Sequence, residues 1–246
     1  MMKVSLNQTI QHLKVLMARI KDVVFPLYSD VQTEDAVSEI LSQLEMVTDP
    51  ETARAFMGRL PEIQRLVVTD VEAVAHVDPA VTDFREIVFC YPAVTAMLYY
   101  RTAHVLHGLG VPVIPRMLTE YAHSVTGIDI HPAARIGDHF AIDHGTGIVI
   151  GATAVIGSHV TLYQGVTLGA KKFTVGPDGR PVDQPRHPIL EDGVTVYSNA
   201  SIHGRITIGA GSVIGGNVWL THSVPPRSRI LQGKTQELDF SDGAGI

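Results

Sequence analysis

In the first 127 residues, apolar positions recur at intervals of three and four, the spacing of one face of an α-helix. Pro50 follows a capping Asp49, and later prolines and glycines punctuate the pattern in the way that helix starts and stops do. The sequence therefore predicts a helical bundle, with helices from Pro50 to about Leu60, from Pro61 to Asp78, from Pro92 to Gly108, and between Pro115 and Gly127.

An amphipathic helix is predicted within the first thirty residues as well. Its apolar positions are Leu13, Leu16, Met17, Ile20, Val23 and Val24. Because its polar face is not especially basic, we expect this helix to pack between subunits rather than on a membrane.

After Gly127 the period changes to six. Aliphatic residues occupy every sixth position in two series, at 150, 156, 162 and 168, and at 190, 196, 202, 208, 214 and 220. The same phase extends back to Ile130, Ile136 and Ile142, and a second uncharged residue follows most of these positions after four residues. Two inward positions per six residues fit a triangular coil of three short strands, about eighteen residues per turn. The second half therefore predicts a parallel β-helix.

The repeat is interrupted between Leu168 and Leu190. Residues 169–188 hold lysines, arginines, prolines and glycines that no side of a β-helix requires, so we expect an external loop. Long loops on regular scaffolds tend to carry function. The predicted organisation is a helical domain over 1–127, a β-helix over 128–226 that carries this loop, and a C-terminal tail over 227–246. The glycines of 209–215 fall on the turns of the repeat and lack a βαβ context, so they do not indicate a dinucleotide loop.

Charge and composition exclude several classes of function. The chain of 246 residues has 19 Lys and Arg against 25 Asp and Glu, a net charge of −6 without a basic run, which argues against nucleic-acid binding. The longest uncharged apolar stretch, 87–100, is too short to cross a bilayer, and charges interrupt every apolar run near the N-terminus. We expect a cytoplasmic protein. Its single cysteine, Cys90, excludes an internal disulfide and is expected to be a buried apolar residue.

Two chemical interpretations arise from the histidines. Asp129 and His144 are 15 residues apart, so neighbouring turns of the β-helix could stack them. An Asp that orients a His leaves the other ring nitrogen free to act as a general base. Polar residues are also common at solvated turns, which leaves an ordinary structural explanation open. Alternatively, His139, His144 and a histidine of a neighbouring subunit could bind zinc, as in a hydratase, although a spacing of five does not match the repeat of six.

Several blocks of this sequence resemble the serine O-acetyltransferases, members of the hexapeptide-repeat acyltransferases. Besides the repeat itself, they are 129–137, 143–151, 164–169, 186–188 and 78–80. The similarity covers about residues 50 to 227, and it implies a left-handed β-helix that transfers acetyl from acetyl-CoA to L-serine in cysteine biosynthesis, without a metal. Another hexapeptide acyltransferase, acting on a sugar or an antibiotic, remains an alternative, as does the zinc hydratase.

The resemblance also implies roles for individual residues. His144 would be the general base and Asp129 would orient it. Asp78 and Asp143 would hold the substrate ammonium, while Arg186 and His187 would hold its carboxylate. Acetyl-CoA would bind in a groove between two β-helices, near Gly169, Ala170 and Ser198, which implies a homotrimer with shared sites, or a dimer of trimers. Residues 171–184 and 197–200 depart from the family pattern.

The C-terminal residues 236–246 are acidic and rich in glycine, with Leu238, Phe240 and Ile246 as their aliphatic or aromatic positions. Composition alone favours a mobile tail. Because many serine acetyltransferases end in an acidic stretch with a terminal isoleucine, the resemblance implies that Ile246 docks into O-acetylserine sulfhydrylase.

Overall fold

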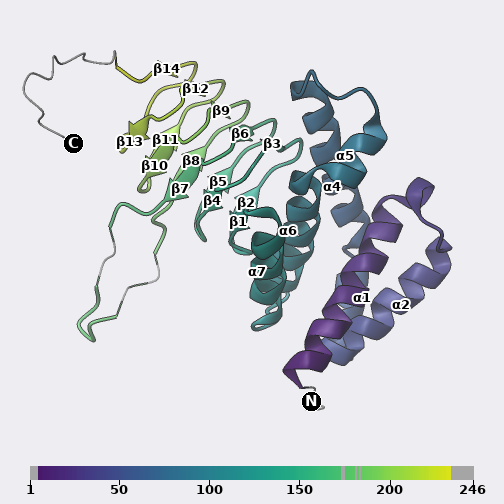
Figure 1. Cartoon of the computed structure of the whole chain (residues 1–246). Helices are drawn as coiled ribbons and strands as arrows, with labels where there is room; N and C mark the ends of the chain where they lie inside the picture. Colours follow the sequence, from purple (N-terminus) through teal and green to yellow (C-terminus); the bar gives the residue numbers. More distant parts are fainter. Residues whose placement is uncertain (1–4, 173–174, 181, 183, 234–246) are drawn as a thin grey trace, which may run out of the picture.

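The computed structural model describes residues 5–172, 175–180, 182 and 184–233. The helical half begins with two antiparallel helices and ends beneath the first strands of the β-helix (Figure 1). Its helices are α1 (Leu6–Val24), the short 3₁₀ helix η1 (Pro26–Tyr28), α2 (Thr33–Val47), α3 (Pro50–Met57), α4 (Leu60–Val77), α5 (Phe84–Cys90), α6 (Pro92–Gly108) and α7 (Ile114–Thr126).

The helix ends follow from local chemistry. Ser5 and Gln8 form a capping box at the start of α1, and the Asp49 carboxylate accepts hydrogen bonds from the backbone of Glu51 and Thr52 at the start of α3. Gly127 ends α7 in the left-handed conformation, with φ of 71°. The four helices predicted from Pro50 onward are confirmed.

One expectation about the helical half is wrong, and another stays a prediction. The predicted apolar residues of α1 are all buried within the chain, where α1 packs on α2 and α4. The packing of α1 between subunits stays a prediction. Cys90 is exposed, because it is the last residue of α5 and the buried side of this helix is formed by Ile87 and Val88.

Residues from Asp129 onward form a left-handed parallel β-helix with three sheets. The first sheet contains β1 (Asp129–Ile130), β4 (Val149–Ile150), β7 (Thr167–Gly169), β10 (Ser201–His203) and β13 (Trp219–Leu220). The second contains β2 (Arg135–Ile136), β5 (Val155–Ile156), β8 (Ile189–Leu190) and β11 (Thr207–Ile208). The third contains β3 (Ala141–Asp143), β6 (Thr161–Tyr163), β9 (Thr195–Val196), β12 (Val213–Ile214) and β14 (Arg229–Ile230).

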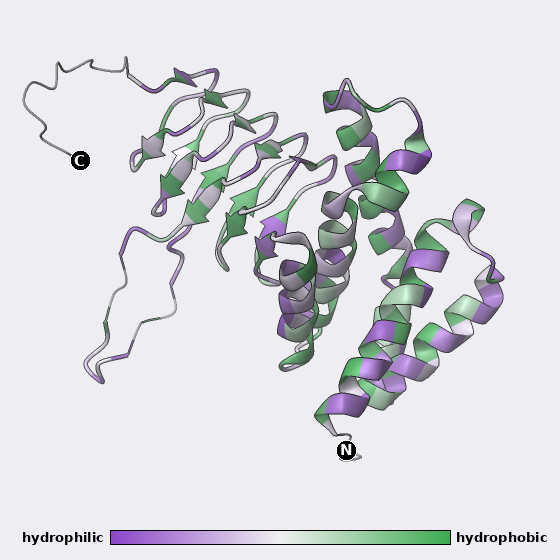
Figure 2. Ribbon diagram, viewed as in Figure 1, coloured by the Kyte–Doolittle hydropathy of each residue, from purple (hydrophilic) through white to green (hydrophobic). Residues whose placement is uncertain are grey.

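The six-residue repeat fills the interior of this β-helix. Each predicted aliphatic position is buried, and the register places Ile150 beside Leu168 and then Ile202 beside Leu220. The hydropathy colouring of Figure 2 accordingly shows mainly hydrophobic strands, whereas the helices carry alternating stripes. The β-helix continues past residue 226, where it was predicted to end. Arg227 takes a left-handed turn with φ of 61°, and β14 then pairs with β12.

The predicted interruption of the repeat is a loop between β7 and β8, and it leaves the stacked strands in Figure 1. The predicted docking segment 236–246 lies outside the described residues.

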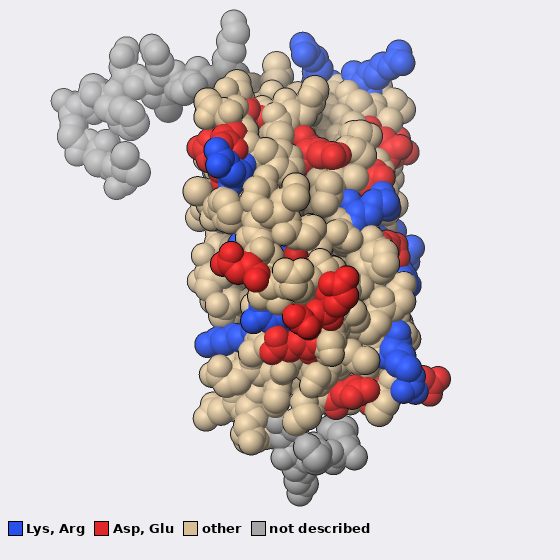
Figure 3. All heavy atoms as spheres, turned by 90° about the vertical axis from the view of Figure 1, so that its right-hand side faces the viewer, with Lys and Arg blue, Asp and Glu red and all other residues tan. Residues whose placement is uncertain are grey.

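No described helix is long and apolar enough to cross a membrane. Figure 3 views the molecule from its helical end and shows acidic and basic side chains interspersed with uncharged surface.

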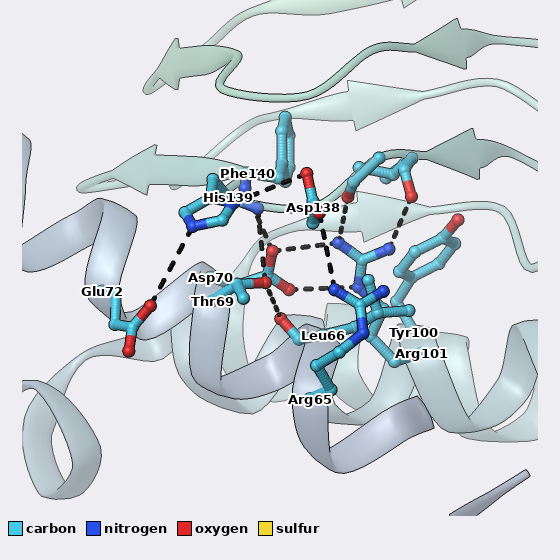
Figure 4. Close-up of polar contacts among 12 residues, drawn as sticks. Arg65, Leu66, Thr69, Asp70, Glu72, Tyr100, Arg101, Asp138, His139 and Phe140 are labelled. Atoms are coloured by element: carbon cyan, nitrogen blue, oxygen red, sulfur yellow. Dashed lines mark hydrogen bonds and ion pairs between the residues drawn. The ribbon is translucent and has the colours of Figure 1, made fainter. Parts of the chain in front are cut away.

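A buried ion pair joins the two halves (Figure 4). Arg101 of α6 donates two hydrogen bonds to the carboxylate of Asp70 on α4, at 3.0 and 2.9 Å, and both residues are 3% exposed. The same guanidinium donates to the carbonyl oxygens of Ile136 and Gly137 in the β-helix, while Asp70 accepts from the backbone N–H of Phe140. Burial raises the pKa of Asp70 to about 6, although Arg101 opposes the shift.

Candidate active site

His144 lies at the corner that follows β3. Its backbone is left-handed, with φ of 56°, a conformation that non-glycine residues adopt rarely and often at functional positions. This turn directs the side chain away from the core, and it is 76% exposed. The preceding residue, Asp143, ends β3 and places a carboxylate oxygen 3.9 Å from Nε2 of His144. The corner therefore presents an accessible imidazole beside an acid.

A second acid reaches this corner from the helical half. Asp78 follows the last residue of α4, and its carboxylate accepts hydrogen bonds from the Tyr91 hydroxyl at 2.5 Å and from the backbone N–H of Ala80 at 2.8 Å. These two hydrogen bonds lower the pKa of Asp78, and the nearby His144 adds to the effect. In return, Asp78 raises the pKa of Tyr91 to about 12. At neutral pH the corner therefore contains an ionised Asp78 and a neutral phenol.

Asp129 lies on β1, which pairs with β4 directly after the corner of His144. Its carboxylate is 3.9 Å from a guanidinium nitrogen of Arg116 on α7. Within the described residues, the ion pairs of Asp129 and His144 thus involve Arg116 and Asp143 respectively, rather than each other. The predicted hydrogen bond between Asp129 and His144 stays a prediction.

The end of the loop before β8 is anchored by Thr153. The Thr153 hydroxyl oxygen accepts from the backbone N–H groups of Arg186 and His187, and Nδ1 of His187 accepts from the backbone N–H of Thr153 at 3.1 Å. Burial, followed by the neighbouring Arg186, lowers the pKa of His187 to about 4. His187 is therefore neutral at pH 7, and this hydrogen bond leaves its proton on Nε2.

The structure brings the predicted substrate residues together in two groups. Asp78, Asp143 and His144 form one group at the corner after β3. Arg186 and His187 form the other, and Arg186 acts electrostatically on His131, as do Asp129 and Arg116. Arg186 and His187 thus lie where Thr153 holds them, at the corner between β4 of the first sheet and β5 of the second.

The three residues predicted to contact CoA border the first sheet. Gly169 ends β7 opposite His203 of β10, and Ala170 follows it into the loop. Ser198 precedes β10 at the other side of the sheet, where its carbonyl accepts from the N–H of Asn217. Together they flank a surface that runs from β7 to β13.

The structure does not bring together the histidines of the zinc hypothesis. His139 precedes β3 and His144 follows it, so they occupy corners separated by a side of the coil, roughly 15 Å of extended chain. The His139 ring instead stacks on His159 at 4.3 Å beside Asp138. Ligand atoms of these three residues lie within 4.8 Å of one another, as do those of Glu120, His123 and Asp129. Neither group includes His144.

Three contributing residues were not predicted from the sequence. Tyr91 holds Asp78, Thr153 holds the returning loop, and Arg116 pairs with Asp129. Tyr91 and Thr153 lie 13 and 33 or more residues from their partners, and no local pattern indicates contacts of this kind.

Comparisons with known proteins show the family to which the chain belongs. No protein-family model matches the chain. A plasmid-encoded serine acetyltransferase of Synechococcus elongatus is 50% identical over 215 residues, which are 87% of this chain and 66% of that protein. The serine acetyltransferase of Mycobacterium tuberculosis is 40% identical over 66% of this chain and 67% of its own length. The chain belongs to the serine acetyltransferase family. The expected family and enzyme class are thereby confirmed.

Solved structures agree with this assignment. Serine acetyltransferase isoform 3 of Entamoeba histolytica, in complex with cysteine, matches 93% of this chain and 84% of that chain, with a TM-score of 0.80 and 32% identity. The enzyme of Neisseria gonorrhoeae, in complex with serine, matches 91% and 84% with a TM-score of 0.67 and 29% identity. That of Brucella abortus, in complex with coenzyme A, matches 90% and 79% with a TM-score of 0.68 and 28% identity.

Proposed function

We propose that this protein transfers the acetyl group of acetyl-CoA to the hydroxyl of L-serine, which yields O-acetyl-L-serine and CoA for cysteine biosynthesis. The observation that carries the proposal is the accessible imidazole of His144 between Asp143 and an ionised Asp78. The complexes of related enzymes with serine and with coenzyme A supply the two substrates.

In the proposed reaction, His144 removes the proton of the serine hydroxyl. The resulting alkoxide attacks the thioester carbonyl, the C–S bond breaks, and the thiolate of CoA takes up the proton from His144. Asp129 orients the imidazole and stabilises its cationic form. A serine hydroxyl is a weak nucleophile, so this proton transfer is the step that the protein must assist. No metal takes part in the proposed reaction.

The charges suit a zwitterionic acceptor. Asp78 and Asp143 bind the ammonium group, and Arg186 binds the carboxylate. His187 is neutral, so we assign it the role of a hydrogen-bond donor through Nε2 rather than that of a second cation. The hydroxyl then lies between the two groups, within reach of His144.

We further propose a homotrimer, or a dimer of such trimers, in the cytoplasm. The division of the site residues into an anionic corner and a cationic loop supports a site completed between neighbouring β-helices. Acetyl-CoA would bind in the groove between them, against Gly169, Ala170 and Ser198. O-Acetylserine sulfhydrylase is the proposed protein partner, through the carboxylate and side chain of Ile246.

The function is tested by measuring CoA release from acetyl-CoA with a panel of acceptors. We expect L-serine to be acetylated and a sugar or an aminoglycoside to be inert at the same concentration. Preference for a sugar hydroxyl would replace the proposed acceptor while keeping the acyltransfer.

The partner is tested with a synthetic peptide of the last ten residues. We expect it to inhibit the sulfhydrylase of the same cell competitively with O-acetylserine. The full chain without Ile246 should lose sulfhydrylase binding and keep acetyl transfer. Unchanged sulfhydrylase binding by this truncated chain would contradict the proposed partnership.

A further inference from the structure

Trp219 is an unusual surface residue in this structure. It is the single tryptophan of the chain, it lies on β13, and it is 70% exposed. Its ring stacks on the His203 imidazole of β10, with centroids 4.4 Å apart and an angle of 29° between the planes. An indole held in a fixed orientation and open on one face is suited to stacking with a planar ligand.

The strand register connects this ring to the proposed catalytic residues. Trp219 pairs with Ser201, Ser201 with Thr167, Thr167 with Val149, and Val149 with Asp129. All five residues are the outward-facing members of their strands, since the residue after each is buried. They form a column on one face that we call the Asp129–Trp219 column. Four steps between strands give it a length of about 19 Å.

Beside the Trp219 end of this column, glycines lie next to His203 and to the cationic Lys171. A Cβ atom at Gly169 would lie 2.7 Å from Nδ1 of His203, so a larger residue there would displace the ring. A Cβ atom at Gly204 would lie 3.2 Å from Cβ of Lys171, which places the lysine stem against the chain directly after His203. The aromatic pair therefore has an exposed ammonium group within reach.

We propose that Trp219, supported by His203, is the surface on which the adenine ring of acetyl-CoA stacks, and that Lys171 contacts its phosphate groups. This inference rests on the proposed function, because it takes acetyl-CoA as the ligand. With the thioester near Asp129 and His144, the pantetheine arm runs along the Asp129–Trp219 column past Thr167 and Ser201.

The length of the column fits this placement. The pantetheine arm contains two amide groups and is about as long as three to four extended residues, ~12 Å. The diphosphate and ribose extend it further, so the adenine falls near the end of the column and a bare pantetheine does not reach Trp219. Charge agrees as well, because the phosphates lie between the arm and the adenine, where Lys171 is located.

The single tryptophan makes the proposal directly measurable. Titration of the full-length protein with CoA should quench the fluorescence of Trp219 in a saturable manner. Pantetheine at the same concentrations should leave the fluorescence unchanged, whereas dephospho-CoA, which keeps the diphosphate and the adenine, should quench it as CoA does. CoA binding shown by calorimetry without any change in fluorescence would overturn the proposal.

Substitution supplies an independent test. Trp219→Ala should raise the KM for acetyl-CoA about tenfold, in line with the effect of removing one stacking aromatic residue. Its kcat and its KM for acetyl-pantetheine should match those of the parent, and Trp219→Phe should recover part of the loss. Lys171→Ala should weaken CoA and dephospho-CoA to the same extent, because both keep the diphosphate, and it should leave acetyl-pantetheine unaffected.

Leu231→Ala is the matched control, because Leu231 is 71% exposed at the same end of the β-helix but follows β14 on the third sheet. It should leave the KM for acetyl-CoA unchanged. An unchanged KM in Trp219→Ala would overturn the proposal, and so would a change of oligomeric state in that variant, which would assign Trp219 to a contact between copies of the chain.

Different results would contradict the stacking site and the proposed function. If the parent protein acetylates serine but CoA does not quench its tryptophan fluorescence, the proposed function stands and the stacking site is refuted. A parent protein that neither binds CoA nor acetylates serine loses both, while quenching by CoA without serine acetylation would retain the stacking site alone.

Discussion

The helical half and the β-helix bury aliphatic side chains in different ways. In the β-helix, each interior residue stacks on its equivalent in the next turn, as Ile150 does on Leu168, and the backbone hydrogen bonds run between turns. In the helical half, each helix satisfies its own backbone, and its apolar stripe needs a partner that lies elsewhere in the sequence. The buried face of α1, for example, packs against α2 and α4.

The two halves therefore position functional side chains in different ways. A repeating scaffold holds its corners rigidly, and in the β-helix the corner after β3 carries His144. Asp78 comes from the segment between α4 and α5, so its position relative to His144 depends on how the helical half is joined to the β-helix. The ion pair of Asp70 and Arg101 forms part of that junction.

The largest expected effect comes from breaking this junction. Arg101→Met leaves Asp70 buried without its cation and removes the donors to Ile136 and Gly137, which should lower the free energy of unfolding by about 3–5 kcal/mol at neutral pH. Chemical denaturation measures the loss. Arg19→Met is the control, because Arg19 pairs with Glu39 and Asp22 at the surface, where a pair contributes about 1 kcal/mol or less.

The Arg101→Met deficit should also depend on pH. The folded pKa of Asp70 is raised to about 6 from its ordinary value of 3.8, so its favourable contribution is present at low pH and is lost as pH rises through the folded pKa. Arg101 lowers this pKa, so in Arg101→Met the pKa of Asp70 is higher and the contribution is lost over a higher range of pH. Acidification toward pH 5 should therefore recover part of the lost stability, and a deficit that is constant from pH 8 to pH 5 would contradict the assignment.

The second effect concerns the β-helix corner. His144→Ala should lower kcat for acetyl transfer about a hundredfold or more, because the general base is lost, while circular dichroism and oligomeric state stay those of the parent. Asp129→Asn should cost less, since it removes orientation rather than the base. A correctly assembled His144→Ala protein with the parent rate would refute the role of His144.

A smaller effect should separate the contributions of the two halves to serine binding. Asp78→Asn and Arg186→Ala should each raise the KM for serine about tenfold, as expected for the loss of roughly 1.4 kcal/mol of binding, with the KM for acetyl-CoA unchanged. Asp78→Asn should remove the advantage of serine over 3-hydroxypropionate, which lacks the ammonium group. Arg186→Ala should remove its advantage over ethanolamine, which lacks the carboxylate.

Asp83→Asn is the control for this experiment. Asp83 lies between α4 and α5 like Asp78, but it caps α5 and pairs with Arg85. Equal losses of serine and acetyl-CoA binding in Arg186→Ala would contradict its assignment to the amino-acid carboxylate.

The smallest expected effect is that of a chelator. Activity should persist after dialysis against a chelator, and the purified protein should lack stoichiometric zinc by elemental analysis, because the proposed base is an imidazole rather than a metal-bound water. A loss of activity that zinc restores would favour a metal-dependent reaction.

The sequence alone determined the β-helix, because the six-residue repeat directly indicates which residues face inward. The stack of equivalent turns leaves one register, so the buried positions from Ile130 to Leu220 could be read without knowledge of the tertiary contacts. The helix boundaries at Asp49 and Gly127 were also local, since capping involves residues within a few positions. The spacing of Asp129 and His144 on the repeat suggested them as a pair, and the resemblance of their blocks to a known family assigned their roles.

Tertiary structure decided the contacts between residues that are distant in the chain. Nothing near Asp78 in the sequence indicates that Tyr91 holds it beside His144, and nothing near Trp219 indicates that its ring stacks on His203. The exposure of Cys90 and the packing of α1 within its own chain were likewise set by helix packing. The physical reason is that a hydrophobic period specifies which side of an element is buried, whereas the partner of that side is chosen by the packing of the whole chain.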